Sequence, residues 1–279
     1  MAISFGREVA NVTLRVIAIL VTIILIVLTL GYLYESEQTI SDGLCNIAFM
    51  PVEGTILPFS GLVDVPLVVT PEEVERFVNA AESESNIDAI LIEINSPGGT
   101  PVASERIAEK LHGSKLPVVV LIGDMAASGG YMVAAAGDHI IASPMSDVGS
   151  IGVNRSFVEE SKKNDEEGLT YVQLTTGEFK DAGSPNRPIT EAERELFQAD
   201  LDLVHQAFVE MVAEYRNLDV DFVQGLANGA SMPGIRALEN NLVDSLGGVN
   251  EAMGILSALT GKTVEETVIC EYTSGPIPF

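Results

Sequence analysis

The stretch Leu116-Pro-Val-Val-Val-Leu-Ile-Gly-Asp-Met-Ala-Ala-Ser-Gly-Gly-Tyr131 passes from an apolar run into a run of small residues. Its first part, residues 116–122, has the aliphatic composition of a strand that is buried on both faces. Its second part places Ser128 after two alanines and before two glycines, which predicts a tight strand-to-helix turn with little steric cover. A lone serine in such a turn is usually structural. It becomes a candidate nucleophile when glycine amides can also approach a substrate carbonyl.

Extended and helical segments alternate on both sides of this stretch. Strands are expected at 46–57, 87–95, 116–122, 139–142, 169–175 and 263–271, and helices at 71–85, 101–112, 128–136, 157–167, 190–217, 220–228, 234–240 and 248–260. Alternation of apolar strands with helices predicts an α/β fold, a parallel sheet flanked by helices on both faces. The glycine-rich loop Ser96-Pro-Gly-Gly99 follows one strand and the Ser128 turn follows another. We therefore expect both loops at the carboxyl edge of the sheet, where ligands usually bind.

The N-terminal region contains an uncharged segment, residues 16–34, made almost entirely of aliphatic side chains. Its length of roughly 19 residues is about that needed to cross a bilayer as a helix. Arg7 and Arg15 precede it, and Glu35 and Glu37 follow it, which predicts a cytoplasmic N-terminus. A cleaved signal peptide is the alternative, but no good small-residue cleavage site follows the segment.

We therefore expect four regions along the chain. These are a cytoplasmic N-terminus at 1–15, a transmembrane anchor at 16–34, a linker at 35–44 and an extracytoplasmic catalytic domain at 45–279. This arrangement predicts a single-pass protein of the cell membrane.

The composition is strongly acidic, with 40 Asp and Glu against 15 Lys and Arg and a formal net charge of −25. Nucleic-acid binding is disfavoured because phosphate contacts need a basic face. Disorder is a poor explanation because apolar periodicity runs throughout the 279 residues. One interpretation is adaptation to high salt, which screens the self-repulsion of an acidic surface. The alternative is an ordinary acidic protein.

Metal and cofactor binding have little support in the sequence. His112, His139 and His205 are isolated, and no Cys and His cluster has metal-ligand spacing, so we expect neither a metal nor a cofactor. The two cysteines, Cys45 and Cys270, do not make a disulfide framework. An outside location permits them to pair, and the sequence leaves open whether they do.

An acyl-transfer serine also needs a base, and the residue types offer two options. His112 ends a predicted helix, His139 lies in a predicted strand, and His205 lies within a predicted helix. All three are expected to be structural. Lys180 leaves a predicted strand and enters a loop, so it can serve either as a surface lysine or as a base. A lysine acts as a base only when neutral, which requires burial in a partly dehydrated site.

Five motifs in order and at matching spacing give the chain a family resemblance. They are Ile94-Asn-Ser-Pro-Gly-Gly99, Ala127-Ser-Gly-Gly-Tyr131, Val148-Gly-Ser-Ile-Gly-Val153, Gly177-Glu-Phe-Lys-Asp181 followed by Ser184-Pro185 and Arg187, and Asn241-Leu-Val-Asp-Ser-Leu-Gly-Gly248. Over nearly all of residues 45–260 the chain resembles the signal peptide peptidase A family of Ser/Lys-dyad serine proteases. The resemblance implies a fold like those of crotonases and Clp proteases.

The resemblance also implies roles for individual residues. Ser128 would be the nucleophile and Lys180 the general base, and the hydroxyl of Ser150 would help to orient the lysine. An oxyanion hole would form from the amide of Gly129 and one amide from Gly98 or Gly99. The segment Ala230-Ser-Met-Pro-Gly-Ile-Arg236 departs from the usual family pattern, which puts the C-terminal packing and subunit contacts in doubt.

Partners and substrates follow from the same resemblance. It implies a homo-oligomer in which the lysine of one subunit reaches the serine of a neighbour, and substrates that are remnant signal peptides or other short apolar peptides. Two other functions stay open. One is a crotonase-type enzyme acting on acyl-CoA, and the other is a membrane-anchored scaffold that binds peptides without cleaving them.

Overall fold

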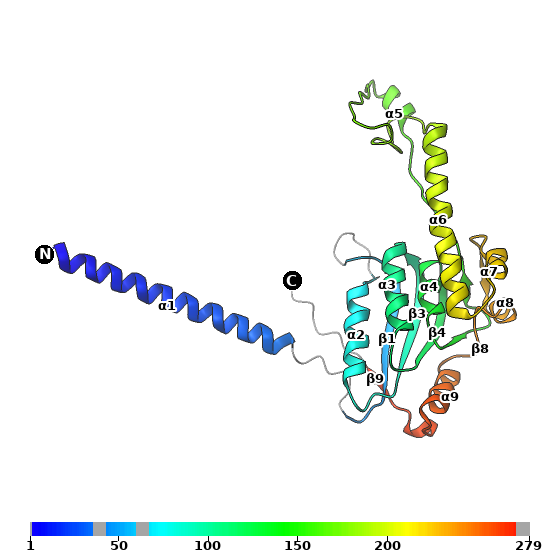
Figure 1. Ribbon diagram of the computed structural model, residues 1–279, viewed down its shortest axis with the longest axis horizontal. Coiled ribbons are helices and arrows are strands. Elements are labelled where there is room, and N and C mark those ends of the chain that lie inside the picture. Colours follow the sequence, from blue (N-terminus) through cyan, green and yellow to red (C-terminus); the bar gives the residue numbers. More distant parts are fainter. Residues whose placement is uncertain (1, 36–42, 60–66, 272–279) are drawn as a thin grey trace. The chain divides into compact units, whose positions relative to one another are not determined.

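The computed structural model describes residues 2–35, 43–59 and 67–271, and these residues fall into two separate units (Figure 1). The first unit contains helix α1 (Ala2–Glu35). Its described apolar side chains, from Leu14 to Leu28, are exposed. In the described part of the chain, no helix combines the length and the apolar character needed to span a membrane. The expected anchor at 16–34 ends on residues whose side chains lie outside the described ones, so it stays a prediction.

The second unit is built on a mainly parallel sheet. Its strands lie in the order β2 (Val68–Val69), β1 (Ile47–Ile56), β3 (Ala89–Gly99), β4 (Val118–Ala127), β5 (His139–Ala142) and β8 (Ser245–Leu246). Strand β6 (Asp147–Gly149) pairs with the end of β4, β9 (Ile269–Glu271) pairs with β1, and β7 (Ser231–Pro233) pairs antiparallel with β6.

Helices cover both faces of this sheet, which confirms the expected architecture. Helices α2 (Pro71–Ser83), α3 (Pro101–His112) and α4 (Gly129–Ala135) pack next to one another along one face (Figure 1). Helix α9 (Val249–Thr260) lies against the other face, where Ala252 and Leu256 pack with Leu91 and Val119. Successive strand residues point to opposite faces, so Ile90 and Ile92 of β3 are also fully buried.

Two strands run further than the sequence predicted, and the extension positions the site. We expected the chain to leave the sheet at 95 and at 122. Instead, Gly98 and Gly99 continue β3 by pairing with Thr55 and Ile56 of β1. The last three residues of β4 pair with β6 in the same way. The glycines at 98–99 are therefore held in β3, and β6 holds the end of β4 directly before the Ser128 turn.

The second unit also contains further helices. They are α5 (Ser161–Glu166), α6 (Glu191–Arg216), α7 (Val220–Leu226), α8 (Gly234–Glu239) and a short 3-10 helix at Val264–Glu266. The long helix α6 begins with a capping box, in which Thr190 accepts from the Glu193 amide and Glu193 accepts from the Thr190 amide. Figure 1 shows α6 reaching beyond the sheet, with α5 near its N-terminal end.

We call residues 155–189, which include α5 and lead into α6, the arm. The predicted helix at 157–167 shortens to α5, and the predicted strand at 169–175 is wrong, because these residues are irregular. Every side chain from 169 to 175 is exposed. A strand needs a hydrogen-bonding neighbour, and the arm lies away from the sheet that would supply one. At the other end of the chain, the predicted strand at 263–271 divides into the 3-10 helix and β9.

The structure also answers the question left open about the cysteines. Cys45, just before β1, forms a disulfide with Cys270 in β9, and their Cα atoms are 5.2 Å apart. Both residues are buried. The bond closes a loop with a sequence separation of 225 and joins the two ends of the sheet-containing unit.

Candidate active site

Ser128 lies where β4 turns into α4, in a backbone conformation that is rare for any residue except glycine. Its φ and ψ are 52° and −123°. Its amide donates to the Gly149 carbonyl at 2.8 Å, and its carbonyl accepts from Tyr131 and Met132. Such strained serines occur at strand-to-helix turns that present a nucleophile. The hydroxyl makes no capping bond to α4, and Ser128 lines a cavity.

The two glycine-rich segments meet directly beside Ser128. A Cβ atom added to Gly98 would lie 2.7 Å from the Gly129 nitrogen and 3.1 Å from the Ser128 Cβ. A Cβ atom added to Gly129 would lie 3.1 Å from the Gly99 nitrogen and 2.2 Å from the Ser104 hydroxyl. No side chain fits at either position, which explains why the sequence places glycine there.

The hydrogen bonds distinguish the two candidate oxyanion donors in β3, the amides of Gly98 and Gly99. The Gly98 amide donates to the Ser96 hydroxyl at 3.1 Å, and that hydroxyl donates to the Gly54 carbonyl at 2.6 Å. Gly129 is the first residue of α4, where backbone N–H groups lack a partner within the helix. The Gly98 amide thus already has a hydrogen-bond partner, whereas the Gly129 amide has none within its helix.

Ser150 also lines the cavity and is held by the segment that departs from the family pattern. Its φ is 51°, its amide donates to the Ala230 carbonyl at 3.2 Å, and its hydroxyl donates to the Gly229 carbonyl at 3.0 Å. Strand β7 continues this contact by pairing with β6. The hydroxyl oxygen keeps capacity to accept a further hydrogen bond, as the expected contact with a lysine requires.

The cavity has a volume of about 660 Å³. Its walls come from the end of β3 at 97–99, Ser128, residues from the segment 150–154, one face of α6 and the turn at 227–229. The α6 face is a contribution that we did not predict. It consists of Gln198, Leu201, Asp202 and His205, which are spaced i, i+3, i+4 and i+7. These positions share one face of the predicted helix at 190–217, but their residue types give no sign of a cavity in the sequence.

The three histidines differ in their surroundings. His112 stacks on Tyr215 with ring centroids 4.3 Å apart, and His139 lies 3.0 Å from the Ser245 hydroxyl, so both have structural partners. His205, which we also expected to be structural, lines the cavity. Its Nε2 atom is buried and is the only such side-chain atom without a hydrogen-bond partner among the described residues. No cluster of His, Cys, Asp and Glu within residues 2–35, 43–59 and 67–271 is arranged to hold a metal ion.

Lys180 is the one predicted site residue that the structure does not bring to the others. It lies in the arm, its side chain is exposed, and it does not line the cavity of its own chain. Ser128, Gly98, Gly99, Gly129 and Ser150 are therefore assembled within one chain, and the expected base is not.

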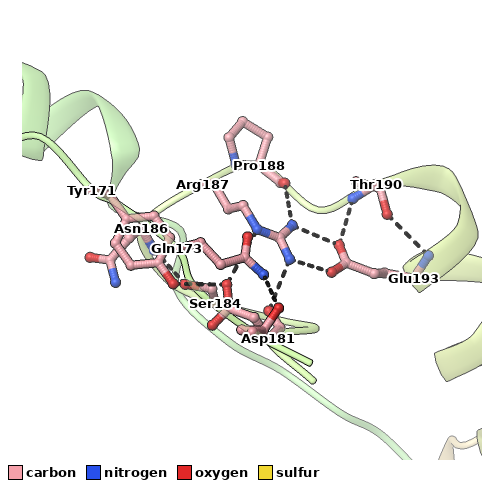
Figure 2. A network of polar contacts seen from close by, with 10 residues as sticks. Tyr171, Gln173, Asp181, Ser184, Asn186, Arg187, Pro188, Thr190 and Glu193 are labelled. Carbon is pink, nitrogen blue, oxygen red and sulfur yellow. Dashed lines mark hydrogen bonds and ion pairs between the residues drawn. The ribbon is translucent and has the colours of Figure 1, made fainter. Parts of the chain in front are cut away.

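The loop that carries Lys180 is nevertheless firmly held, as Figure 2 shows. Arg187 donates to both carboxylate oxygens of Glu193, at 2.5 and 3.0 Å, and to the Asp181 carbonyl at 2.9 Å. The Tyr171 hydroxyl donates to the Asp181 carboxylate at 2.8 Å. These bonds tie the residue next to Lys180 to the N-terminus of α6.

Charge stabilises this network. Hydrogen bonds from the Arg187 guanidinium and the Thr190 amide lower the pKa of Glu193 to about 2. The Glu193 carboxylate in turn raises the pKa of Arg187. Because Glu193 is buried, its carboxylate needs these donors to replace the hydrogen bonds of water, and it holds them in place in return.

Several known proteases are similar to this chain. The model of peptidase family S49 matches residues 110–262, and that of the ClpP-like SDH-type serine proteinases matches residues 60–155. A "putative protease" of Methanocaldococcus jannaschii is 35% identical over 189 residues, which are 67% of this chain and 61% of the relative. A "putative signal peptide peptidase SppA" of Enterococcus faecium is 32% identical over 201 residues, covering 71% of this chain and 58% of the relative. The chain thus spans about three fifths of the length of these relatives.

Among solved structures, the chain is similar to a mutant of the 1510-N membrane-bound stomatin-specific protease. The TM-score is 0.50 and the sequence identity 19%, over 82% of this chain and 94% of that one. At this identity the match concerns the fold, and it agrees with the parallel sheet and flanking helices described above.

Proposed function

Because the chain belongs to peptidase family S49, we propose that it is a serine endopeptidase in which Ser128 is the nucleophile and Lys180 the general base. One observation carries the proposal. A serine in a strained strand-to-helix turn lies against two glycine segments that admit no side chain. Acyl transfer requires a hydroxyl that a substrate can reach beside paired amide donors, and Ser128 lines a cavity next to the glycine amides that could serve.

The proposed reaction begins when neutral Lys180 takes the proton of the Ser128 hydroxyl as the oxygen attacks a peptide carbonyl. The Gly129 and Gly99 amides stabilise the oxyanion, an effect typically worth about 3 kcal/mol per donor. Lys180 then protonates the leaving amine. Water hydrolyses the acyl-enzyme with the lysine again acting as base.

We place the lysine of one subunit at the serine of another, so the active protein is a homo-oligomer with shared sites. Two observations support this. Lys180 is exposed and absent from its own cavity, and the arm that carries it exposes large apolar side chains at Val158, Val172 and Leu174. Assembly would bury these side chains and remove water from around Lys180, which lowers the pKa of a lysine.

The substrates we propose are remnant signal peptides and other short apolar peptides at the membrane. The uncharged segment at 16–34 would anchor the protein, with the catalytic domain outside the cytoplasm. The Cys45–Cys270 disulfide supports that location, because such bonds persist in oxidising compartments. The E. faecium relative is named a signal peptide peptidase, which supports the substrate class.

The test combines two inactive variants. Ser128→Ala and Lys180→Met should each abolish peptide hydrolysis, and only proteins that keep Ser128 should react with a fluorophosphonate probe. The wild type should have an alkaline activity optimum, because its base is a lysine. Co-refolding the two variants should restore part of the activity, since a mixed assembly contains sites with both groups. Hydrolysis that survives Ser128→Ala would refute the peptidase mechanism, and mixed assemblies without activity would refute the shared site.

The two alternative functions make different predictions. A crotonase-type enzyme needs cationic groups for the CoA phosphates, and no Lys or Arg is found among the described residues that line the cavity. A scaffold would bind peptides with equal affinity in the wild type and in Ser128→Ala without cleaving them.

A further inference from the structure

One face of α6 forms a polar wall in the cavity that contains Ser128. Gln198, Asp202 and His205 supply its polar atoms, and Leu201 lies between them. The Gln198 side-chain amide donates to the Asp202 carboxylate at 2.8 Å, which fixes both side chains one turn apart. We call these four residues the α6 wall.

The α6 wall presents hydrogen-bond acceptors to the cavity. A carboxylate such as that of Asp202 has about four acceptor sites, of which Gln198 occupies one. The buried Nε2 atom of His205 has no partner in the described structure. Leaving a buried polar atom unpaired costs free energy, so a ligand that supplies a donor there is favoured. In the neutral imidazole one ring nitrogen accepts a hydrogen bond.

Charge points to the same kind of ligand. Asp202 is the only Asp or Glu among the described residues that line the cavity, and no Lys or Arg of the same chain lines it. The whole chain has a formal charge of −25. A cationic group with several N–H donors is therefore attracted to the cavity and matched by its wall.

We infer that the α6 wall is a specificity subsite for a lysine or arginine side chain next to the scissile bond of the peptide. The inference rests on the proposed peptidase function, because it uses Ser128 to place the scissile bond in the same cavity. The ammonium or guanidinium group would donate to Asp202 and to Nε2 of His205, while its aliphatic stem packs on Leu201. The subsite extends the substrate class beyond purely apolar peptides.

The experiment measures cleavage of a peptide library in which one residue on either side of the scissile bond is Arg, Lys, Leu or Glu. The wild type should cleave the best Arg or Lys peptide at least tenfold more efficiently than its Leu counterpart, in kcat/KM. Asp202→Asn should reduce that ratio by about tenfold, which corresponds to 1.4 kcal/mol of discrimination. His205→Leu should reduce the ratio as well, and His205→Gln should recover part of it because glutamine keeps an acceptor.

Asp200→Asn is the matched control, since Asp200 lies on the same helix, is exposed and does not line the cavity. It should leave both the ratio and the activity unchanged. A wild type that cleaves Leu peptides as well as basic ones, or variants that keep the wild-type ratio, would overturn the subsite. That outcome leaves the peptidase standing as long as Ser128→Ala is inactive. Full activity of Ser128→Ala would instead remove the proposed function itself.

Discussion

The contact between the two glycine segments can be tested with one methyl group, by the substitution Gly98→Ala. The added Cβ would lie 2.7 Å from the Gly129 nitrogen, 2.9 Å from the Ala127 carbonyl oxygen and 3.1 Å from the Ser128 Cβ. The first two neighbours are backbone atoms and cannot move aside as a side chain would. The methyl group therefore occupies the space in front of the Gly129 amide, where the oxyanion would bind.

Two energetic effects follow from this substitution. The φ of Gly98 is +100°, and holding an alanine in such a conformation costs about 1–3 kcal/mol of stability. Blocking one oxyanion donor lowers kcat by about 100- to 1000-fold. The first effect is read from chemical denaturation, and the second from peptide hydrolysis and from the rate of fluorophosphonate labelling at Ser128.

The control Gly261→Ala separates these two effects. Gly261 ends α9 with a φ of +70°, and a Cβ there meets no atom within 4 Å. Gly261→Ala should lose stability through its positive φ alone, without the steric contacts of Gly98→Ala, and should keep its activity. If folded Gly98→Ala hydrolyses peptides at the wild-type rate, the Gly129 amide does not act as an oxyanion donor and our reading of the site is wrong.

Four further predictions concern the arm, the disulfide and the surface. Because the pKa of Glu193 is lowered to about 2, its contribution to stability is present above its ordinary pKa of 4.5 and is lost as the pH falls toward 2. Glu193→Gln should therefore have a lower unfolding midpoint than the wild type above pH 4.5, and the difference should shrink as the pH falls toward 2. Arg187→Lys, which loses the two-pronged contact with Glu193, should lower kcat through a misplaced Lys180 while KM changes little, and an unchanged kcat would argue against a positioning role. In the chain-entropy model, loss of the Cys45–Cys270 bond, with its separation of 225 residues, costs about 5 kcal/mol, so an identical denaturation midpoint with and without reductant would contradict the bond. If the net charge of −25 reflects adaptation to salt, the unfolding midpoint should rise steeply with KCl, and a flat response would identify an ordinary acidic protein.

The elements that pack in the core were the ones that the sequence predicted well. Helix α3 and strand β5 begin and end at the predicted residues, since α3 opens with Pro101 and β5 is a short apolar run. These signals are local, because a helix start and a buried strand depend on the residues that form them. The Ser128 turn was predicted for the same reason, from small residues that follow a buried strand.

Features that depend on distant partners were predicted poorly. The strand expected at 169–175 has a suitable composition but no neighbouring strand, and β3 extends to Gly99 only because β1 runs alongside it. The pairing of the cysteines and the cavity position of His205 also depend on segments far apart in the sequence. A single isolated histidine gives no local sign of the cavity that it will face.

The proposed catalytic groups lie in two different parts of the fold, the packed sheet and the exposed arm. Ser128 and the glycine amides belong to the buried end of a parallel sheet, where a methyl group is too large. Lys180 belongs to the exposed arm, which is tied to α6 through Arg187 and Glu193 rather than to the sheet. Within one chain the exposed Lys180 does not line the cavity that contains Ser128. If our mechanism is right, the isolated subunit should therefore be inactive, and proteolysis should begin only when an arm from another subunit closes over the cavity.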